Sequence, residues 1–178
     1  MRAVVLVEGI SDRVALEALA ERRGRDLAAE GVSIVPMGGA QAIGRFLEHF
    51  SGLDVALAGL CDAGEEADFR RALERAGFGS GLTRDEMEEH GFYVCVEDLE
   101  DELVRSVGPA AVEQVITAEG DLGTFRTFQR QLAKRDLPYE EQLWRFMWNR
   151  KARYASLLVG ALDLSQVPRP LEGVLARV

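Results

Sequence analysis

The sequence predicts an α/β protein in which a parallel β-sheet lies between two layers of helices and a helical extension follows. Two observations support this fold class. Short apolar runs alternate with helical stretches over the first hundred residues, whereas only helical periodicity remains after about residue 99. Uninterrupted apolar runs of this length are typical of parallel strands covered on both faces. We therefore expect a three-layer, Rossmann-like domain at residues 1–107 and a helical extension at 108–178, packed on the same core.

The first half divides into alternating strands and helices. The predicted strands are 3–7, 32–36, 55–61 and 92–96, and the predicted helices are 11–24, about 43–50 and 65–76. Ser11 is the expected N-cap of the first helix, and residues 85–89 are expected to form a charged turn. The pair Gly38-Gly39 could bring backbone amides close to a phosphate. It lacks the lysine and spacing of a Walker loop, so nucleoside triphosphate hydrolysis by this chain is not expected.

The second half shows five helical patterns. They cover residues 103–107, 110–116, 125–132, 143–148 and 152–162. Leu137-Pro138 is the expected hinge between two of these helices. We expect them to form a cap that packs on one edge of the sheet.

Three of the apolar runs end in acidic residues. Glu8 and Asp12 follow the first run. The other two acidic groups are Asp62, Glu65 and Glu66 after the third run, and Glu97, Asp98 and Glu100 after the fourth. In a parallel sheet these groups meet at the carboxyl edge, where open α/β folds place their sites. Because clustered carboxylates repel one another, a bound divalent cation is the most direct relief, and Mg²⁺ or Mn²⁺ is the predicted cofactor.

These acidic segments resemble the TOPRIM domain, and most closely the version found in overcoming lysogenization defect (OLD) family nucleases. The segments that carry the resemblance are Val7-Glu8-Gly9-x-Ser11-Asp12, the strand that ends at Asp62, and Glu97-Asp98-Leu99-Glu100, with a looser similarity at 149–155 and 168–171. The second acidic segment of the family usually reads Asp-x-Asp. Here Gly64 stands at the position of its second aspartate. Glu65 or Glu66 could reach the same ion; alternatively, the site holds one metal weakly, or the protein binds without cutting.

The resemblance implies a set of site residues. The implied metal ligands are Glu8, Asp12, Asp62, Glu65, Asp98 and Glu100. Glu8 is also implied as a general acid or base. Lys151 falls where the resemblance places a lysine near the metal, where an ammonium could stabilise charge on a scissile phosphate. Lys151 is equally explained as a lysine that faces solvent.

Charge is distributed unevenly along the chain. The net charge is −9, but residues 1–121 carry −14 and residues 122–178 carry +5. A basic flank could guide a nucleic-acid backbone towards an acidic metal site, although Arg126, Arg130, Lys134 and Arg135 are equally explained as the solvated face of a helix. Aromatic and basic residues alternate between Trp144 and Tyr154. Such a mixture can stack bases, but aromatic side chains at this spacing are more often core anchors.

The sequence thus predicts a metal-dependent nucleic-acid phosphodiesterase, a DNA endonuclease or nickase, with DNA favoured over RNA as its substrate. The alternative is a catalytically weak TOPRIM module that binds nucleic acid or a partner protein such as a separate ATPase. A third interpretation assigns the acids to helix N-termini, where the dipole favours negative charge.

No apolar run approaches the ~20 residues that cross a bilayer, and the first strand leaves no room for a signal peptide. A cytoplasmic protein without a membrane partner is expected. Cys61 and Cys95 are expected to be buried free thiols, because neither has a metal-ligand neighbour in the sequence.

Overall fold

The sheet has four parallel strands in the order β2-β1-β3-β4, and the computed structural model describes all of residues 1–178. The strands are β1 (Ala3–Val7), β2 (Val32–Pro36), β3 (Ala56–Cys61) and β4 (Phe92–Val94). Each of the three neighbouring pairs is parallel. The predicted parallel α/β sandwich is therefore confirmed, although β4 ends two residues before the expected end of its apolar run.

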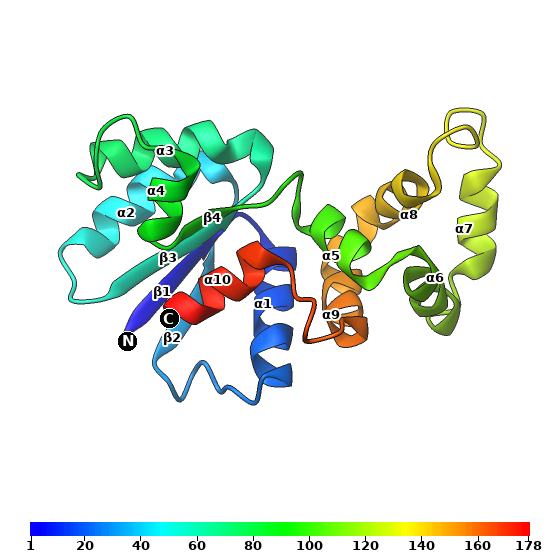
Figure 1. Cartoon of the computed structure of the whole chain (residues 1–178), viewed down its shortest axis with the longest axis horizontal. Helices are drawn as coiled ribbons and strands as arrows, with labels where there is room; N and C mark the ends of the chain where they lie inside the picture. Colours follow the sequence, from blue (N-terminus) through cyan, green and yellow to red (C-terminus); the bar gives the residue numbers. More distant parts are fainter.

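Helices cover both faces of the sheet (Figure 1). The helices on one face are α2 (Ile43–Ser51), α3 (Glu66–Arg75) and α4 (Arg84–Glu89), and those on the opposite face are α1 (Ile10–Arg22) and α10 (Arg169–Arg177). Side chains of β1 alternate between these layers, as the twofold period of a strand requires. Val4 and Leu6 pack under α2 and α3, whereas Val5 and Val7 pack under α1. All five residues of β1 are buried, which explains its uninterrupted apolar sequence.

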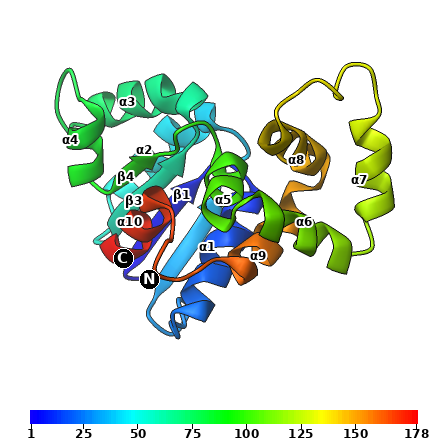
Figure 2. The same cartoon turned by 45° about the vertical axis from the view of Figure 1, so that its right-hand side comes forward.

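The helical extension lies on the side where the strands end, as Figures 1 and 2 show. From here on, the helical extension means the helices of residues 99–161. These are α5 (Leu99–Val107), α6 (Pro109–Ala118), α7 (Leu122–Gln129), α8 (Tyr139–Met147) and α9 (Lys151–Ala161). Helix α9 packs along α1, and Arg22 of α1 donates hydrogen bonds to the carbonyls of Val159 and Leu162 at 2.6 and 2.8 Å. One cluster of buried hydrophobic residues runs from β1 through α1 into the extension, so the sheet and the extension share a core.

Helix α10 returns the chain to the sheet after the extension. It packs against β3 and β4, and Arg25 donates a hydrogen bond of 2.7 Å to the carbonyl of Val178. Its Gly173 lies so close to Tyr93 of β4 that a Cβ there would come within 2.3 Å of the ring. This last helix is not among the predicted elements.

Two local predictions were wrong. The N-cap of α1 is Gly9 rather than Ser11, because the side chain of Asp12 already accepts the Gly9 N–H at 2.7 Å and the helix begins at Ile10. The predicted charged turn at 85–89 is helix α4. Thr83 caps it by accepting the N–H of Glu86, while the Glu86 carboxylate accepts the N–H of Thr83, and this reciprocal pair starts the helix.

Cys61 and Cys95 are buried and form no disulfide, as expected. No helix in the structure combines the length and the apolar character needed to cross a lipid bilayer.

A substitution at Gly59 tests the close packing at the centre of β3. A Cβ at this position would lie 2.7 Å from Cδ1 of Phe92 and 3.1 Å from the backbone oxygen of Leu6. Because Phe92 is fully buried, Gly59→Ala should lower the free energy of unfolding by ~1–3 kcal/mol. The matched control is Gly160→Ala in α9, where the Cβ meets open space and should stabilise by ~0.5–1 kcal/mol. Urea denaturation measures both values, and an unchanged stability for Gly59→Ala would contradict the packing described.

Candidate metal centre

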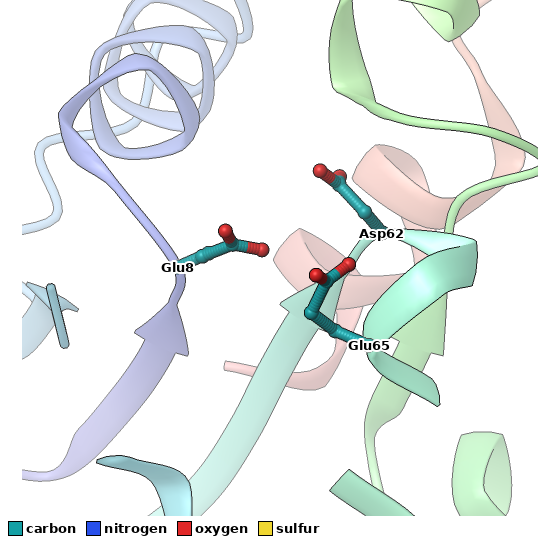
Figure 3. A group of neighbouring side chains, drawn as sticks. All are labelled: Glu8, Asp62 and Glu65. Atoms are coloured by element: carbon teal, nitrogen blue, oxygen red, sulfur yellow. The ribbon is translucent and has the colours of Figure 1, made fainter. Parts of the chain in front are cut away.

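Three carboxylates from two neighbouring strands converge at the carboxyl edge of the sheet. Glu8 directly follows β1, Asp62 directly follows β3, and Glu65 ends the 3₁₀ helix η2 (Ala63–Glu65). One oxygen from each side chain lies within 4.8 Å of the others. Figure 3 shows the three side chains pointing into one shared space. We call these residues the carboxylate triad.

The backbone on both sides of Glu8 is held in place. The carbonyl of Glu8 accepts the N–H groups of Gly38 and Gly39 at 3.1 and 3.2 Å, and the next N–H, of Gly9, donates to Asp12. Gly38 and Gly39 have positive φ angles of 76° and 124°, which glycine adopts without the strain of a Cβ. The glycine pair therefore positions Glu8. Its amides are not free for a phosphate, contrary to the hypothesis from the sequence.

Asp62 begins the turn that carries Glu65 into the triad. The carbonyl of Asp62 accepts the N–H of Glu65 at 3.1 Å, and the N–H of Ala63 donates to the carbonyl of Glu97 at 2.9 Å. Glu66 forms ion pairs with Arg70 and Arg84 instead. Of the two glutamates that the sequence offered as replacements for the missing aspartate, only Glu65 lies with Glu8 and Asp62.

The position of the missing aspartate is sterically open. A Cβ at Gly64 would meet no atom within 4 Å, and Gly64 does not have a positive φ angle. No packing constraint in the chain therefore accounts for the glycine.

Asp98, Glu100 and Lys151 form a second group beside the triad, which we call the lysine cluster. Nζ of Lys151 lies 2.7 Å from Oε2 of Glu100 and 3.7 Å from Oδ2 of Asp98. Asp98 is the N-cap of α5 and accepts the N–H of Asp101 at 2.8 Å. Both acids are buried, being only 6% and 3% exposed. In this arrangement they neutralise the lysine rather than complete the triad.

Trp144 is a site residue that sequence reasoning did not assign to this centre. Its indole Nε1–H donates to both carboxylate oxygens of Asp98, at 2.9 and 3.0 Å. The contact joins positions 46 residues apart in the chain. No local pattern could reveal it, because the pairing depends on how α8 packs against α5.

A cavity of about 350 Å³ connects the two groups. Its walls include Glu8, Asp12, Asp62, Glu100 and Lys151. Asp12 is buried at the start of α1 and lines this cavity together with residues of both groups. The structure thus brings all seven residues proposed from the sequence to one edge of the sheet, in two groups joined by this cavity.

Burial and mutual repulsion dominate the electrostatics of the centre. Burial, reinforced by the charges of Asp12 and Glu8, raises the pKa of Asp62 to about 8. Burial also raises the pKa of Asp12 to about 7, although the N–H of Gly9 opposes this shift. The pKa of Glu8 is raised by burial and by the charge of Glu65. None of these four carboxylates forms an ion pair with a lysine or arginine at 4 Å or less.

Lys151 provides positive charge on one side of the centre. Burial acts to lower the pKa of Lys151, but the hydrogen bond and charge of Glu100, aided by Asp98 and Asp62, outweigh it and the pKa is raised. The pKa of Glu100 is nevertheless raised, because burial outweighs the attraction of Lys151. Lys151 is therefore the only basic side chain that forms an ion pair with any of the six carboxyl groups of the centre, and it pairs with two of them.

The donor set fits a hard divalent cation. Oε2 of Glu8 and Oε1 of Glu100 are buried and accept no hydrogen bond, although buried carboxylate oxygens normally have a partner. The triad offers only oxygen ligands, which Mg²⁺ and Mn²⁺ prefer. The acidic cluster could hold such an ion, and a double positive charge would relieve the repulsion that raises these pKa values.

Comparisons with known proteins agree with this fold. Residues 1–63 match the family model of the TOPRIM domain of overcoming lysogenization defect protein-like proteins. The chain is similar in structure to the C-terminal region of the Xanthomonas campestris pv. campestris OLD protein, with a TM-score of 0.77, 23% identity, and coverage of 99% of this chain and 91% of that chain. The C-terminal region of the Burkholderia pseudomallei OLD protein gives a TM-score of 0.75, 21% identity, and coverage of 99% and 96%. No curated protein matches the chain in sequence.

The predicted resemblance to an OLD-like TOPRIM domain is therefore confirmed. The sequence match covers the first three strands, Glu8 and Asp12 of the first acidic segment, and Asp62 of the second, and it ends before Gly64 and Glu65. The structural match extends the likeness in fold through the helical extension and α10. An OLD-like TOPRIM match implies a metal-binding domain related to nucleic acids.

The raised pKa values predict that the metal-free chain loses stability as pH rises. Asp12 and Asp62 bind protons more tightly in the folded than in the unfolded state, whose pKa is near the ordinary 3.8. Stability should therefore fall between about pH 4 and about pH 8. Asp62→Asn should reduce this fall and raise stability at about pH 8.5 by roughly 1 kcal/mol, a Tm increase of ~2–4 °C. Thermal melts in a chelator across this pH range measure both effects.

A matched variant, Asp54→Asn, changes an exposed acid outside the centre and should leave the pH profile unchanged. Added Mn²⁺ should raise the Tm of the parent chain at about pH 8.5 because ligands stabilise the state that binds them. The same addition should have little effect on Asp62→Asn. A metal-free Tm that rises with pH through this window would contradict the electrostatics described.

Proposed function

We propose that this chain is a metal-dependent nucleic-acid phosphodiesterase, an endonuclease or nickase that cuts DNA with Mg²⁺ or Mn²⁺ as its cofactor. The observation that carries the proposal is the carboxylate triad. Oxygens of Glu8, Asp62 and Glu65 lie within 4.8 Å of one another, and no basic side chain pairs with them. Such a group is suited to a cation that in turn binds a phosphate.

The residues of the centre would have four roles. Glu8, Asp62 and Glu65 would hold the ion, and Asp12 would hold the turn at Gly9 through its hydrogen bond of 2.7 Å. When bound, the ion supplies Lewis-acid stabilisation of the phosphate and lowers the pKa of a water nucleophile. The buried oxygen of Glu8 that lacks a hydrogen-bond partner is also suited to take a proton, so Glu8 is a candidate general base.

Lys151 is proposed to stabilise negative charge on the scissile phosphate. Its side chain lines the same cavity as Glu8 and Asp62 and is 27% exposed. The ammonium remains charged because Glu100 and Asp98 raise its pKa. A positive charge held in place before the reaction avoids the cost of reorganisation when the transition state forms.

The second candidate function is a catalytically weak module that binds nucleic acid or a partner protein such as a separate ATPase. Two observations favour it. Gly64 contributes no oxygen ligand where the family usually has a second aspartate. The carboxylate of Asp98 already accepts hydrogen bonds from the indole N–H of Trp144 and the backbone N–H of Asp101. This candidate predicts binding without cleavage, so an activity assay separates the two.

Cleavage should require the triad. In a plasmid-nicking assay with Mn²⁺ or Mg²⁺, Glu8→Gln and Asp62→Asn should each reduce the rate at least about a hundredfold, because each removes a charged oxygen ligand. The matched controls are Glu17→Gln and Asp54→Asn, which alter exposed acids outside the centre and should retain full activity. Absence of nicking by the parent chain with either metal would favour the binding module.

Lys151→Met should reduce cleavage by about 10²- to 10³-fold, the usual cost of removing one electrostatic contact to a transition state. The change also leaves Glu100 buried without its partner, which should lower stability. The double variant Lys151→Met with Glu100→Gln removes that unpaired charge and should regain stability but not activity. Nicking rates and urea denaturation of both variants test this, and recovery of cleavage together with stability would show that Lys151 has only a structural role.

A further inference from the structure

A basic groove in the extension opens beside the lysine cluster. It lies between the end of α7 and the outer face of α8 and has a volume of about 540 Å³. Its lining residues are Phe128, Gln131, Lys134, Trp144, Arg145, Trp148 and Asn149. We call this feature the tryptophan groove. No acidic side chain is among the residues that line it.

The aromatic residues of the Trp144–Tyr154 segment separate into two groups in the structure. Phe146 and Tyr154 are buried and act as core anchors. Trp148 is 49% exposed, and Trp144 is half-buried. The two indoles pack edge to face with their centroids 5.1 Å apart. Since Trp148 is exposed, the part of its ring that Trp144 and Lys151 do not cover is available to a ligand.

Positive charge lies on one side of the indole pair. Lys134 forms no ion pair and lies over the ring of Phe128 at 5.6 Å, whereas Arg145 pairs with Glu141. A second groove, which Trp144 also lines, contains four acids, Glu97, Asp101, Glu140 and Glu141, and one basic residue, Arg105. A polyanion is therefore attracted to the side of Lys134 and repelled from the side of Glu140.

The tryptophan groove is in direct contact with the candidate metal centre. Trp144 donates its indole N–H to Asp98, and Lys151 lies over the ring of Trp148 at 4.1 Å. Lys151 also pairs with Glu100. The two indoles thus form the wall between the groove and the lysine cluster.

We propose that the tryptophan groove binds an unpaired stretch of DNA strand, with bases stacked on Trp148 and phosphates near Lys134. An exposed indole flanked by cations is suited to stack a base and pair its phosphate. The strand is unpaired because duplex bases present their edges, and not their faces, to a protein. The proposal deepens the proposed function by naming the form of the substrate. The binding itself does not depend on cleavage.

Binding is measured by fluorescence anisotropy of a labelled oligothymidine in a chelator, with the full chain. Trp148→Leu should weaken binding by about 5- to 140-fold, the range for one base stacked on an aromatic ring. Trp148→Phe keeps an aromatic face for stacking and should lose clearly less affinity than Trp148→Leu. Leu132→Ala, which alters an exposed apolar residue that does not line the groove, is the matched control and should bind as the parent does.

Lys134→Gln tests the charge of the groove independently of the indole. It should weaken binding and make the dependence of log affinity on log salt shallower by about one unit or less. Arg71→Gln removes one positive charge from α3, outside the groove, and should preserve the slope. Thermal melts of each variant verify that folding is unchanged.

Three results would overturn the proposal: unchanged affinity in Trp148→Leu, equal losses in the leucine and phenylalanine variants, or a duplex of the same length that binds as tightly as the single strand. Because the chelator excludes metal-dependent cleavage, these results are separate from those of the nicking assay. If the chain binds the single strand through the groove but does not nick DNA, the proposed nuclease activity is refuted and the groove proposal stands. If the chain nicks DNA but Trp148→Leu binds with unchanged affinity, the groove proposal is refuted and the nuclease activity stands.

Discussion

Repulsion between carboxylates at the edge of a buried sheet is the constraint on which the site depends. β1 and β3 are neighbours in the sheet, so the residues that directly follow them, Glu8 and Asp62, are close together. Glu65 adds a third charge from the next turn. Such an arrangement costs folding free energy unless protons or a cation bind. The repulsion is confined to one edge of the sheet, and hydrogen bonds from Gly38 and Gly39 hold the backbone of Glu8 there.

The acids at this edge of the sheet form two groups that differ in whether their carboxylates have hydrogen-bond or ion-pair partners. Glu100 has a lysine within 2.7 Å, and Asp98 has an indole N–H and a backbone N–H. The triad has no such partners. Glu100 and Asp98 therefore hold the Lys151 ammonium in place, whereas the carboxylates of the triad are available to bind a metal ion. All of them lie at the same edge of the sheet. Function in a site of this kind depends on the partners of each carboxylate, and not only on the number of carboxylates.

Much of the fold could be predicted from the sequence because its signals are local. The uninterrupted apolar residues of β1 and the acids after each strand give the sheet and its edge directly. The indole contact between Trp144 and Asp98 and the return of α10 to the sheet could not be predicted, because both depend on packing between distant segments. The start of α1 was misassigned for a different, local reason: Ser11 and Asp12 both suit a helix start, and it is the carboxylate of Asp12 that accepts the Gly9 N–H.

The return of α10 to β3 and β4 has a consequence for movement. Helices α5 to α9 leave the sheet after β4 and rejoin it at α10, so two chain crossings connect them to the sheet. Helix α9 also packs along α1 in the core that the extension shares with the sheet, so packing as well as the two crossings holds the extension in place. The indoles and the carboxylates should therefore keep nearly the same separation, and a strand bound across both would meet a surface of fixed length.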